Sequence, residues 1–99
     1  MNLERKIAVI GLGYVGLPLA IEYGKKYRVL GFDINAERVA ELKRGEDRTL
    51  EADLEGMKQA TNLYKKTGNK GLSFSANVED LRLFDTFIVT VPTPIDEYN

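Results

Sequence analysis

The 99-residue sequence contains no cysteine, no histidine and no tryptophan, and only three prolines. Without cysteine, the chain can form no disulfide, no thiolate zinc site and no cysteine nucleophile. Without histidine, it lacks the commonest metal ligand and general base, which leaves carboxylates, lysines and hydroxyls for acid–base chemistry. We therefore expect no metal site in this chain.

An excess of charge of one sign is also missing. Fourteen lysines and arginines balance fifteen aspartates and glutamates, so the formal net charge is −1. This balance gives no electrostatic reason to expect nucleic acid or an anionic membrane as a partner. The apolar run that follows Arg5 and Lys6 is too short and too interrupted by glycines and Pro18 for a signal peptide or a membrane span. We expect a cytoplasmic protein with a single domain over residues 1–99.

The most informative stretch lies where an apolar run meets a helical pattern. Lys6 to Ile10 shows little alternation, which predicts a strand covered on both faces. The residues GLGYVG follow from Gly11 to Gly16, and an apolar stripe at helical spacing then predicts a helix from Val15 to about Lys25. A strand, a glycine turn and a helix in this order are typical of dinucleotide-binding proteins.

Each glycine of this turn has a distinct function in the dinucleotide-binding interpretation. Gly11 allows the sharp turn, Gly13 lets the backbone approach a pyrophosphate, and Gly16 lets the helix pack close to its strand. The helix N-terminus then presents free N–H groups to the phosphates. Glycines also mark turns for steric reasons alone, so the surrounding sequence has to decide between the two interpretations.

An acidic residue follows the second predicted strand. Tyr27 to Phe32 forms a short apolar stretch of strand-forming residues and ends at Asp33, 22 positions after Gly11. A carboxylate at this place can accept hydrogen bonds from the ribose hydroxyls of NAD and would repel the extra phosphate of NADP. The alternative is that Asp33 only caps the next helix.

The next helix is predicted from Ala36 to about Arg44, with Asn35 as its cap. Arg38 lies at its exposed start. It could reach the adenosine end of a dinucleotide, although an arginine in a first turn is usually a solvated side chain. The sequence alone leaves both interpretations of Arg38 open.

The remaining elements complete an alternating pattern. A third helix carries an apolar stripe that is expected to be core, made of Leu54, Met57, Thr61 and Tyr64. A third strand is predicted over Leu72–Ser75 and a short helix over Asn77–Phe84. A fourth strand is predicted over Thr86–Val91, and it ends at two prolines. The order predicts an α/β fold with a Rossmann-type parallel sheet, strand order 3-2-1-4, which is half of a dinucleotide-binding domain. The fourth strand has an apolar free edge, so we expect either self-association through residues 86–91 or coverage of the edge by residues 92–99, and the prolines of that tail favour association.

Three motifs carry a family resemblance that covers the whole chain: GLGYVGLPLA from Gly11 to Ala20, GFDIN from Gly31 to Asn35, and VTVPTPID from Val89 to Asp96. The chain resembles the N-terminal part of nucleotide-sugar 6-dehydrogenases, which include UDP-glucose and GDP-mannose dehydrogenases. The VPTPID ending and the residues DRTLE from Asp47 to Glu51 are most similar to the branch that acts on UDP-N-acetylhexosamines, as in Vi polysaccharide biosynthesis.

The resemblance implies a cofactor, a set of contacts and a reaction. The cofactor would be NAD, held by the backbone of Tyr14 and Val15 at the pyrophosphate, by Asp33 and Arg38 at the adenosine ribose, and by Val91 and Thr93 beside the bound cofactor. Members of the family oxidise the C6 alcohol of a nucleotide sugar to a carboxylate in two NAD-dependent steps, through an intermediate on a catalytic cysteine, for surface polysaccharide biosynthesis.

Since this chain has no cysteine, the resemblance identifies it as a truncated N-terminal segment without catalytic residues. We expect it to be inactive alone and to bind NAD weakly, with the UDP-sugar substrate bound only in the full-length parent. A non-catalytic regulatory module that senses NAD would use the same glycines and Asp33. The N-terminal segment of a flavoprotein is a third alternative, which the VPTP ending disfavours.

Overall fold

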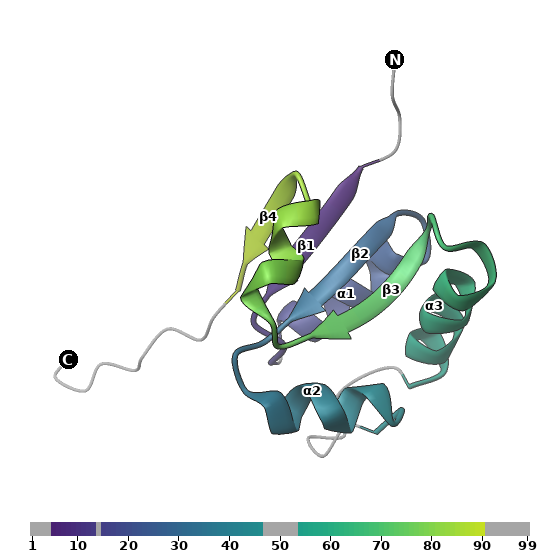
Figure 1. Ribbon diagram of the computed structural model, residues 1–99. Helices are drawn as coiled ribbons and strands as arrows, with labels where there is room; N and C mark the ends of the chain where they lie inside the picture. Colours follow the sequence, from purple (N-terminus) through teal and green to yellow (C-terminus); the bar gives the residue numbers. More distant parts are fainter. Residues whose placement is uncertain (1–4, 14, 47–53, 91–99) are drawn as a thin grey trace, which may run out of the picture.

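The computed structural model describes residues 5–13, 15–46 and 54–90, and a four-stranded parallel sheet lies at its centre (Figure 1). The strands are β1 (Lys6–Ile10), β2 (Arg28–Phe32), β3 (Gly71–Ser75) and β4 (Thr86–Val89). Their order across the sheet is β3-β2-β1-β4, which confirms the predicted order 3-2-1-4 and the α/β fold class. All three neighbouring pairs are parallel, so every strand ends at the same edge of the sheet.

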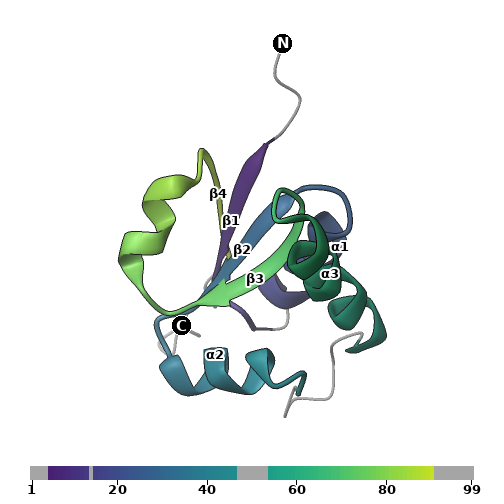
Figure 2. The ribbon, with the colours of Figure 1, turned by 45° about the vertical axis from the view of Figure 1, so that its right-hand side comes forward.

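Helices cover the sheet unequally. Helices α1 (Gly16–Gly24) and α3 (Leu54–Thr67) pack on one face, whereas the short 3-10 helix η1 (Val78–Leu83) lies on the other, as Figure 2 shows with the sheet between them. Helix α2 (Ala36–Lys43) runs across the end at which β2 and β3 finish (Figure 1). The first two helices begin and end within two residues of their predicted bounds, which is the usual uncertainty of helix ends.

The main core fills the face beneath α1 and α3. The strand register places Ile7 of β1, Val29 of β2 and Leu72 of β3 side by side, so their side chains point to the same face. All three are buried together with Leu17 and Ile21 of α1. β1 is therefore covered as its lack of alternation predicts.

The predicted core stripe of the third helix is wrong in part. Met57 is buried, but Leu54 at the start of the helix is 40% exposed, and the buried face is completed by Gly56 and Ala60 instead. The reason is the close contact with α1: a side-chain carbon at Gly24 would lie 3.3 Å from the Cβ atom of Ala60. Small residues at this contact let the two helices approach closely, which rotates the larger side chains away from it.

Tyr64, also in the predicted stripe, packs against a cation and not in the main core. The guanidinium of Arg28, at the start of β2, lies 3.9 Å from the centre of the Tyr64 ring and 5.1 Å from that of Phe84. Desolvation by burial lowers the pKa of Arg28, against the raising effect of Tyr64. This cluster joins β2 to α3 at the amino end of the strands, opposite the edge at which they finish.

The short helix after β3 differs from the prediction in type. Asn77 caps it as expected, since its Oδ1 accepts a hydrogen bond from the N–H of Glu79 at 3.0 Å. The turns that follow are 3-10 turns, with the N–H of Asp80 bonded to the carbonyl of Asn77 at 3.0 Å, and the helix ends at Leu83 before Phe84. Six residues are too few for two full turns of α-helix, and the more tightly wound 3-10 helix is common in short connectors of this kind.

The η1 face of the sheet carries only a small apolar cluster. Ala8, Leu30 and Phe84 are buried there. Phe87 of β4 pairs with Ala8 and so lies on the same face, yet it is 49% exposed, and Val89 is 62% exposed. Within the described residues β4 pairs with β1 alone, so its outer edge and part of this face stay uncovered.

Candidate functional site

Three segments that are distant in sequence meet where the strands finish. The N–H of Gly11, directly after β1, donates to the carbonyl of Phe32 at 2.8 Å, and the N–H of Thr90, directly after β4, donates to that of Ile10 at 2.8 Å. Asp33, directly after β2, donates its own N–H to the carbonyl of Ser75 at 3.2 Å. These bonds continue the sheet by one residue and fix Gly11, Asp33 and Thr90 along one edge.

The fold itself requires two of the three glycines in the turn. Gly11 has a φ of 100°, which an L side chain rarely adopts. A Cβ atom at Gly16 would overlap the carbonyl oxygen of Gly11 and Oγ1 of Thr90. Any side chain at Gly16 would therefore push α1 away from β1, in agreement with the predicted close packing.

Gly13 is different, because the described residues give no steric reason for it to be glycine. Among them, nothing lies within 4 Å of the place where a Cβ atom would be, and Gly13 is exposed. The absence of a side chain at Gly13 leaves the backbone accessible from outside. This is what the approach of a pyrophosphate requires, as the sequence predicts for this position.

The start of α1 faces the same region. Val15 occupies the N-cap position with 61% exposure, and no side chain of the described residues caps the helix there. The first turn holds no acidic residue. The N–H groups of an uncapped helix start and the helix dipole together favour an anion. Tyr14, the other predicted backbone contact, lies outside the described residues.

Asp33 holds the glycine turn and is not the cap of α2. Its Oδ2 accepts from the N–H of Leu12 at 2.9 Å, and its Oδ1 accepts from the N–H of Asn35 at 2.9 Å. The cap is Asn35, whose Oδ1 accepts from the N–H groups of Glu37 at 2.9 Å and Arg38 at 3.2 Å. The carboxylate is thus fixed at the edge of the sheet, half-buried, with lone pairs left for further donors.

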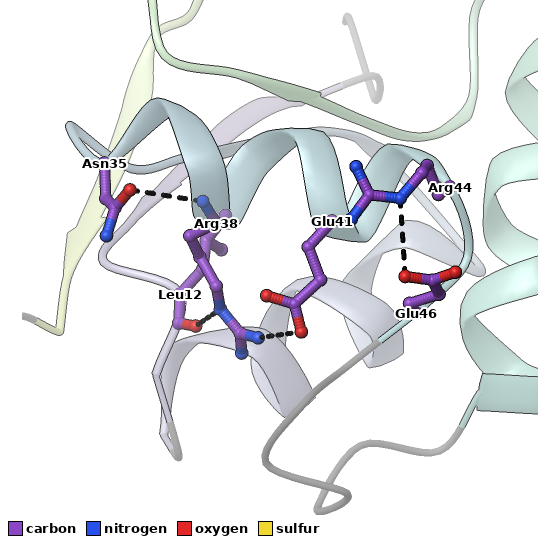
Figure 3. A network of polar contacts seen from close by, with 6 residues as sticks. All are labelled: Leu12, Asn35, Arg38, Glu41, Arg44 and Glu46. Atoms are coloured by element: carbon purple, nitrogen blue, oxygen red, sulfur yellow. Dashed lines mark hydrogen bonds and ion pairs between the residues drawn. The ribbon is translucent and has the colours of Figure 1, made fainter.

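Arg38 folds back toward the glycine turn. Its Nε donates to the carbonyl oxygen of Leu12 at 2.9 Å, and its NH1 lies 3.4 Å from Oε2 of Glu41, as Figure 3 shows. The side chain is only 12% exposed, so the expectation of an exposed arginine is wrong. The physical reason is that the backbone of Leu12 offers a buried acceptor within reach of the guanidinium.

Two residues of this region were missed by the sequence analysis. Glu41 is buried, with a side chain that is 3% exposed, and it pairs with Arg38 one helical turn earlier. Thr90 donates its hydroxyl to the carbonyl of Gly11 at 2.9 Å. The spacing of three between Arg38 and Glu41 is a detectable signal for the first. For Thr90 the signal is a hydroxyl residue at the end of the strand that precedes Val91 and Thr93, both of which lie outside the described residues.

A separate hollow lies away from this edge. It has a volume of about 710 Å³ between the end of α2, α3 and β3, and Leu42, Met57, Leu72 and Phe74 are among its lining residues. It includes neither the glycine turn nor Asp33. The chemistry of Gly13, Asp33 and the α1 N-terminus, not the volume of this hollow, identifies the candidate site.

The described segments contain no group of three or more histidine, cysteine, aspartate or glutamate residues that could hold a metal ion. Among the helices of the same segments, none has the length and apolar character needed to cross a membrane.

Comparison with known proteins adds independent evidence. Residues 5–99 match the model of the UDP-glucose/GDP-mannose dehydrogenase family, NAD binding domain. The chain is 56% identical over 95 residues to a UDP-N-acetyl-D-glucosamine 6-dehydrogenase of Pseudomonas aeruginosa, an alignment that covers 96% of this chain and 20% of that protein. It is 46% identical over 95 residues to the enzyme of the same name from Salmonella typhi, with 96% and 20% covered.

A solved structure agrees in fold. The UDP-D-ManNAc dehydrogenase from Pyrococcus horikoshii superposes with a TM-score of 0.74 at 33% sequence identity, covering 92% of this chain and 21% of that one. The chain thus spans only about a fifth of the length of the relatives that it matches.

Proposed function

The chain belongs to the UDP-glucose/GDP-mannose dehydrogenase family and matches its NAD-binding domain. We propose that the sheet edge at Gly11, Asp33 and Thr90 holds the ADP portion of NAD. Residues 1–99 would form one half of the dinucleotide-binding domain of a longer enzyme. In this fold a dinucleotide lies across the junction of two such halves.

The observation that carries the proposal is the contrast among the glycines. The fold demands glycine at positions 11 and 16, whereas the described residues leave open space around Gly13, beside the start of α1, which no described side chain caps. A bare backbone beside a helix N-terminus suits a pyrophosphate. The half-buried carboxylate of Asp33 lies on the same edge, where it can accept hydrogen bonds from ribose hydroxyls.

Each residue has a defined task in this proposal. Gly13 and Val15 bind the pyrophosphate through the backbone, together with Tyr14, while Gly11 and Gly16 shape the turn. Asp33 and Arg38 lie at the adenosine ribose in this proposal, and Arg38 also holds the carbonyl of Leu12 so that the turn keeps its shape. Val91 and Thr93 are proposed to line the cofactor from the fourth strand. NAD, when bound, accepts a hydride from substrate; the residues described here bind and orient it.

The relatives support a substrate class for the longer enzyme. Two of them are named UDP-N-acetyl-D-glucosamine 6-dehydrogenase and share 56% and 46% identity with this chain. We propose that the full-length protein oxidises C6 of a UDP-N-acetylhexosamine in the cytoplasm to supply surface polysaccharide. The sugar and the catalytic groups would be bound by parts of the enzyme outside this chain. The interpretation as a regulatory NAD sensor has no support among the family and relatives found.

The proposal is tested by titrating the isotopically labelled 99-residue chain with ADP and with NAD and following its amide resonances. Shifts should be concentrated at Gly13, Val15 and Asp33, and ADP should compete with NAD nearly as well as NAD itself, because the site holds the ADP half. Amides at the amino end of the strands, such as that of Arg28, serve as the internal control. An absence of shifts at these three residues with millimolar NAD would contradict the proposal.

A further inference from the structure

A buried ion pair lies beside the proposed ribose site. The carboxylate of Glu41 is 3.4 Å from the guanidinium of Arg38, and both side chains are nearly enclosed, at 3% and 12% exposure. Figure 3 shows the arginine between Leu12 on one side and Glu41 on the other. A carboxylate is seldom buried to this degree unless it is paired, so this pair is a built feature of α2.

The pair is connected to Asp33 through a single residue. The N–H of Leu12 donates to Asp33 and its carbonyl accepts from Arg38, each at 2.9 Å. Arg38 is therefore a cation in the same hydrogen-bond network as the acid that is proposed to bind the ribose. An arginine at this place is also the group that accommodates the 2′-phosphate of NADP in related folds. By itself, Arg38 would work against the preference for NAD that Asp33 provides.

We propose that Glu41 is a specificity-determining residue that keeps the site selective for NAD by engaging the charge of Arg38. The carboxylate offsets part of the charge of the guanidinium and helps to hold it against Leu12, so that a 2′-phosphate at the ribose meets a weaker positive charge. Glu41 acts through Arg38 and does not touch the nucleotide. This inference rests on the proposed function and adds to it the residue that governs the choice between the two cofactors.

The test measures the dissociation constants of NAD and NADP for the 99-residue chain and for Glu41→Gln, by amide-shift titration. The substitution should lower the ratio of the NADP constant to the NAD constant about tenfold, through tighter NADP binding, since removing one negative charge from beside the guanidinium is worth about that factor for a nearby phosphate. A ratio that stays within about twofold of the wild-type value would overturn the inference.

Glu37→Gln is the matched control, because it removes the same formal charge from the same helix at an exposed position. It should leave the ratio unchanged. An equal effect of Glu37→Gln would mean that net charge alone sets the ratio and would overturn the inference.

Dependence on Arg38 is tested with Arg38→Gln and the double variant Arg38→Gln/Glu41→Gln. If Glu41 acts through Arg38, the two variants should share one ratio. A full tenfold effect of Glu41→Gln in the absence of Arg38 would overturn the inference. If Glu41→Gln fails to fold, Glu41→Asp keeps the charge but withdraws the carboxylate from the arginine, and a smaller shift of the ratio in the same direction is expected.

The failure of this inference can be told apart from the failure of the proposed function. A wild-type chain that binds NAD, combined with an unchanged ratio in Glu41→Gln and Glu41→Asp, overturns only the role of Glu41. A wild-type chain that binds neither nucleotide overturns both.

Discussion

The Nε atom of Arg38 donates a hydrogen bond of 2.9 Å to the main-chain carbonyl of Leu12, 26 positions earlier in the chain. Leu12 also donates its N–H to the carboxylate of Asp33, so both polar groups of its backbone are held by side chains of residues that follow β2. The two bonds therefore connect the glycine turn to Asp33 on one side and to α2 on the other.

Substitutions at Asp33 and Asn35 should distinguish an effect on nucleotide binding from an effect on stability. Asp33→Ala should weaken NAD or ADP binding about tenfold or more, because it removes the acceptor for the ribose hydroxyls. Asn35→Ala is the control, since it removes only the cap of α2 and should cost about 1 kcal/mol of unfolding free energy with unchanged affinity. Amide-shift titration and thermal unfolding of both variants provide the two measurements. Unchanged affinity in Asp33→Ala would contradict the ribose role.

Alanine substitutions at Gly13 and Gly16 should have opposite effects: one should weaken ADP binding and the other should lower stability. Gly16→Ala should destabilise the fold by about 3 kcal/mol or more, because its Cβ atom would meet the Gly11 carbonyl and Thr90. Gly13→Ala has open space and should leave the unfolding free energy nearly unchanged while weakening ADP binding, because the methyl group occupies the approach of the phosphates. Chemical denaturation and ADP titration distinguish the two. An ADP affinity of Gly13→Ala equal to that of the wild-type chain would contradict the proposed pyrophosphate contact.

The chain alone should produce no NADH from UDP-N-acetylglucosamine and NAD. It has no thiol to form the covalent intermediate that the family resemblance implies for this reaction. The measurement is absorbance of NADH over hours, with a no-protein control and a preparation shown to be free of contaminating dehydrogenase. Production above that control would contradict the expectation of an inactive segment.

The outer edge of β4 should make the chain self-associate. Phe87 and Val89 are exposed on this strand, which pairs only with β1 in the described part of the chain. Unpaired N–H and C=O groups beside apolar side chains favour pairing with another copy. Light scattering should show a mass that rises with concentration, and Phe87→Lys should reduce the rise. A monomeric mass at high concentration with fast amide exchange from Phe87 to Val89 would show the edge to be bare.

The order of the elements could be read from the sequence because its signals are local. The apolar run before Gly11, the cap at Asn35 and the prolines after the fourth strand each mark a boundary within a few residues. Right-handed crossovers together with the glycine pattern of a dinucleotide-binding fold then favour the order 3-2-1-4, which the structure has. The predictions of burial were wrong where packing against a neighbouring element determined which side chains are buried. Leu54 was expected in the core, but the contact of Ala60 with Gly24 turned the α3 face away from it.

The sequence by itself determined the α/β fold, the glycine turn and the position of Asp33 at the end of β2, since these follow from chain order and backbone geometry. Only the tertiary structure decided where the side chains of Arg38, Glu41 and Thr90 go. Arg38 and Thr90 find their partners 26 and 79 positions away in the glycine turn, and Glu41 is buried against Arg38 only because α2 packs across the strand ends. Such contacts depend on the placement of whole elements, which no local pattern of residues encodes.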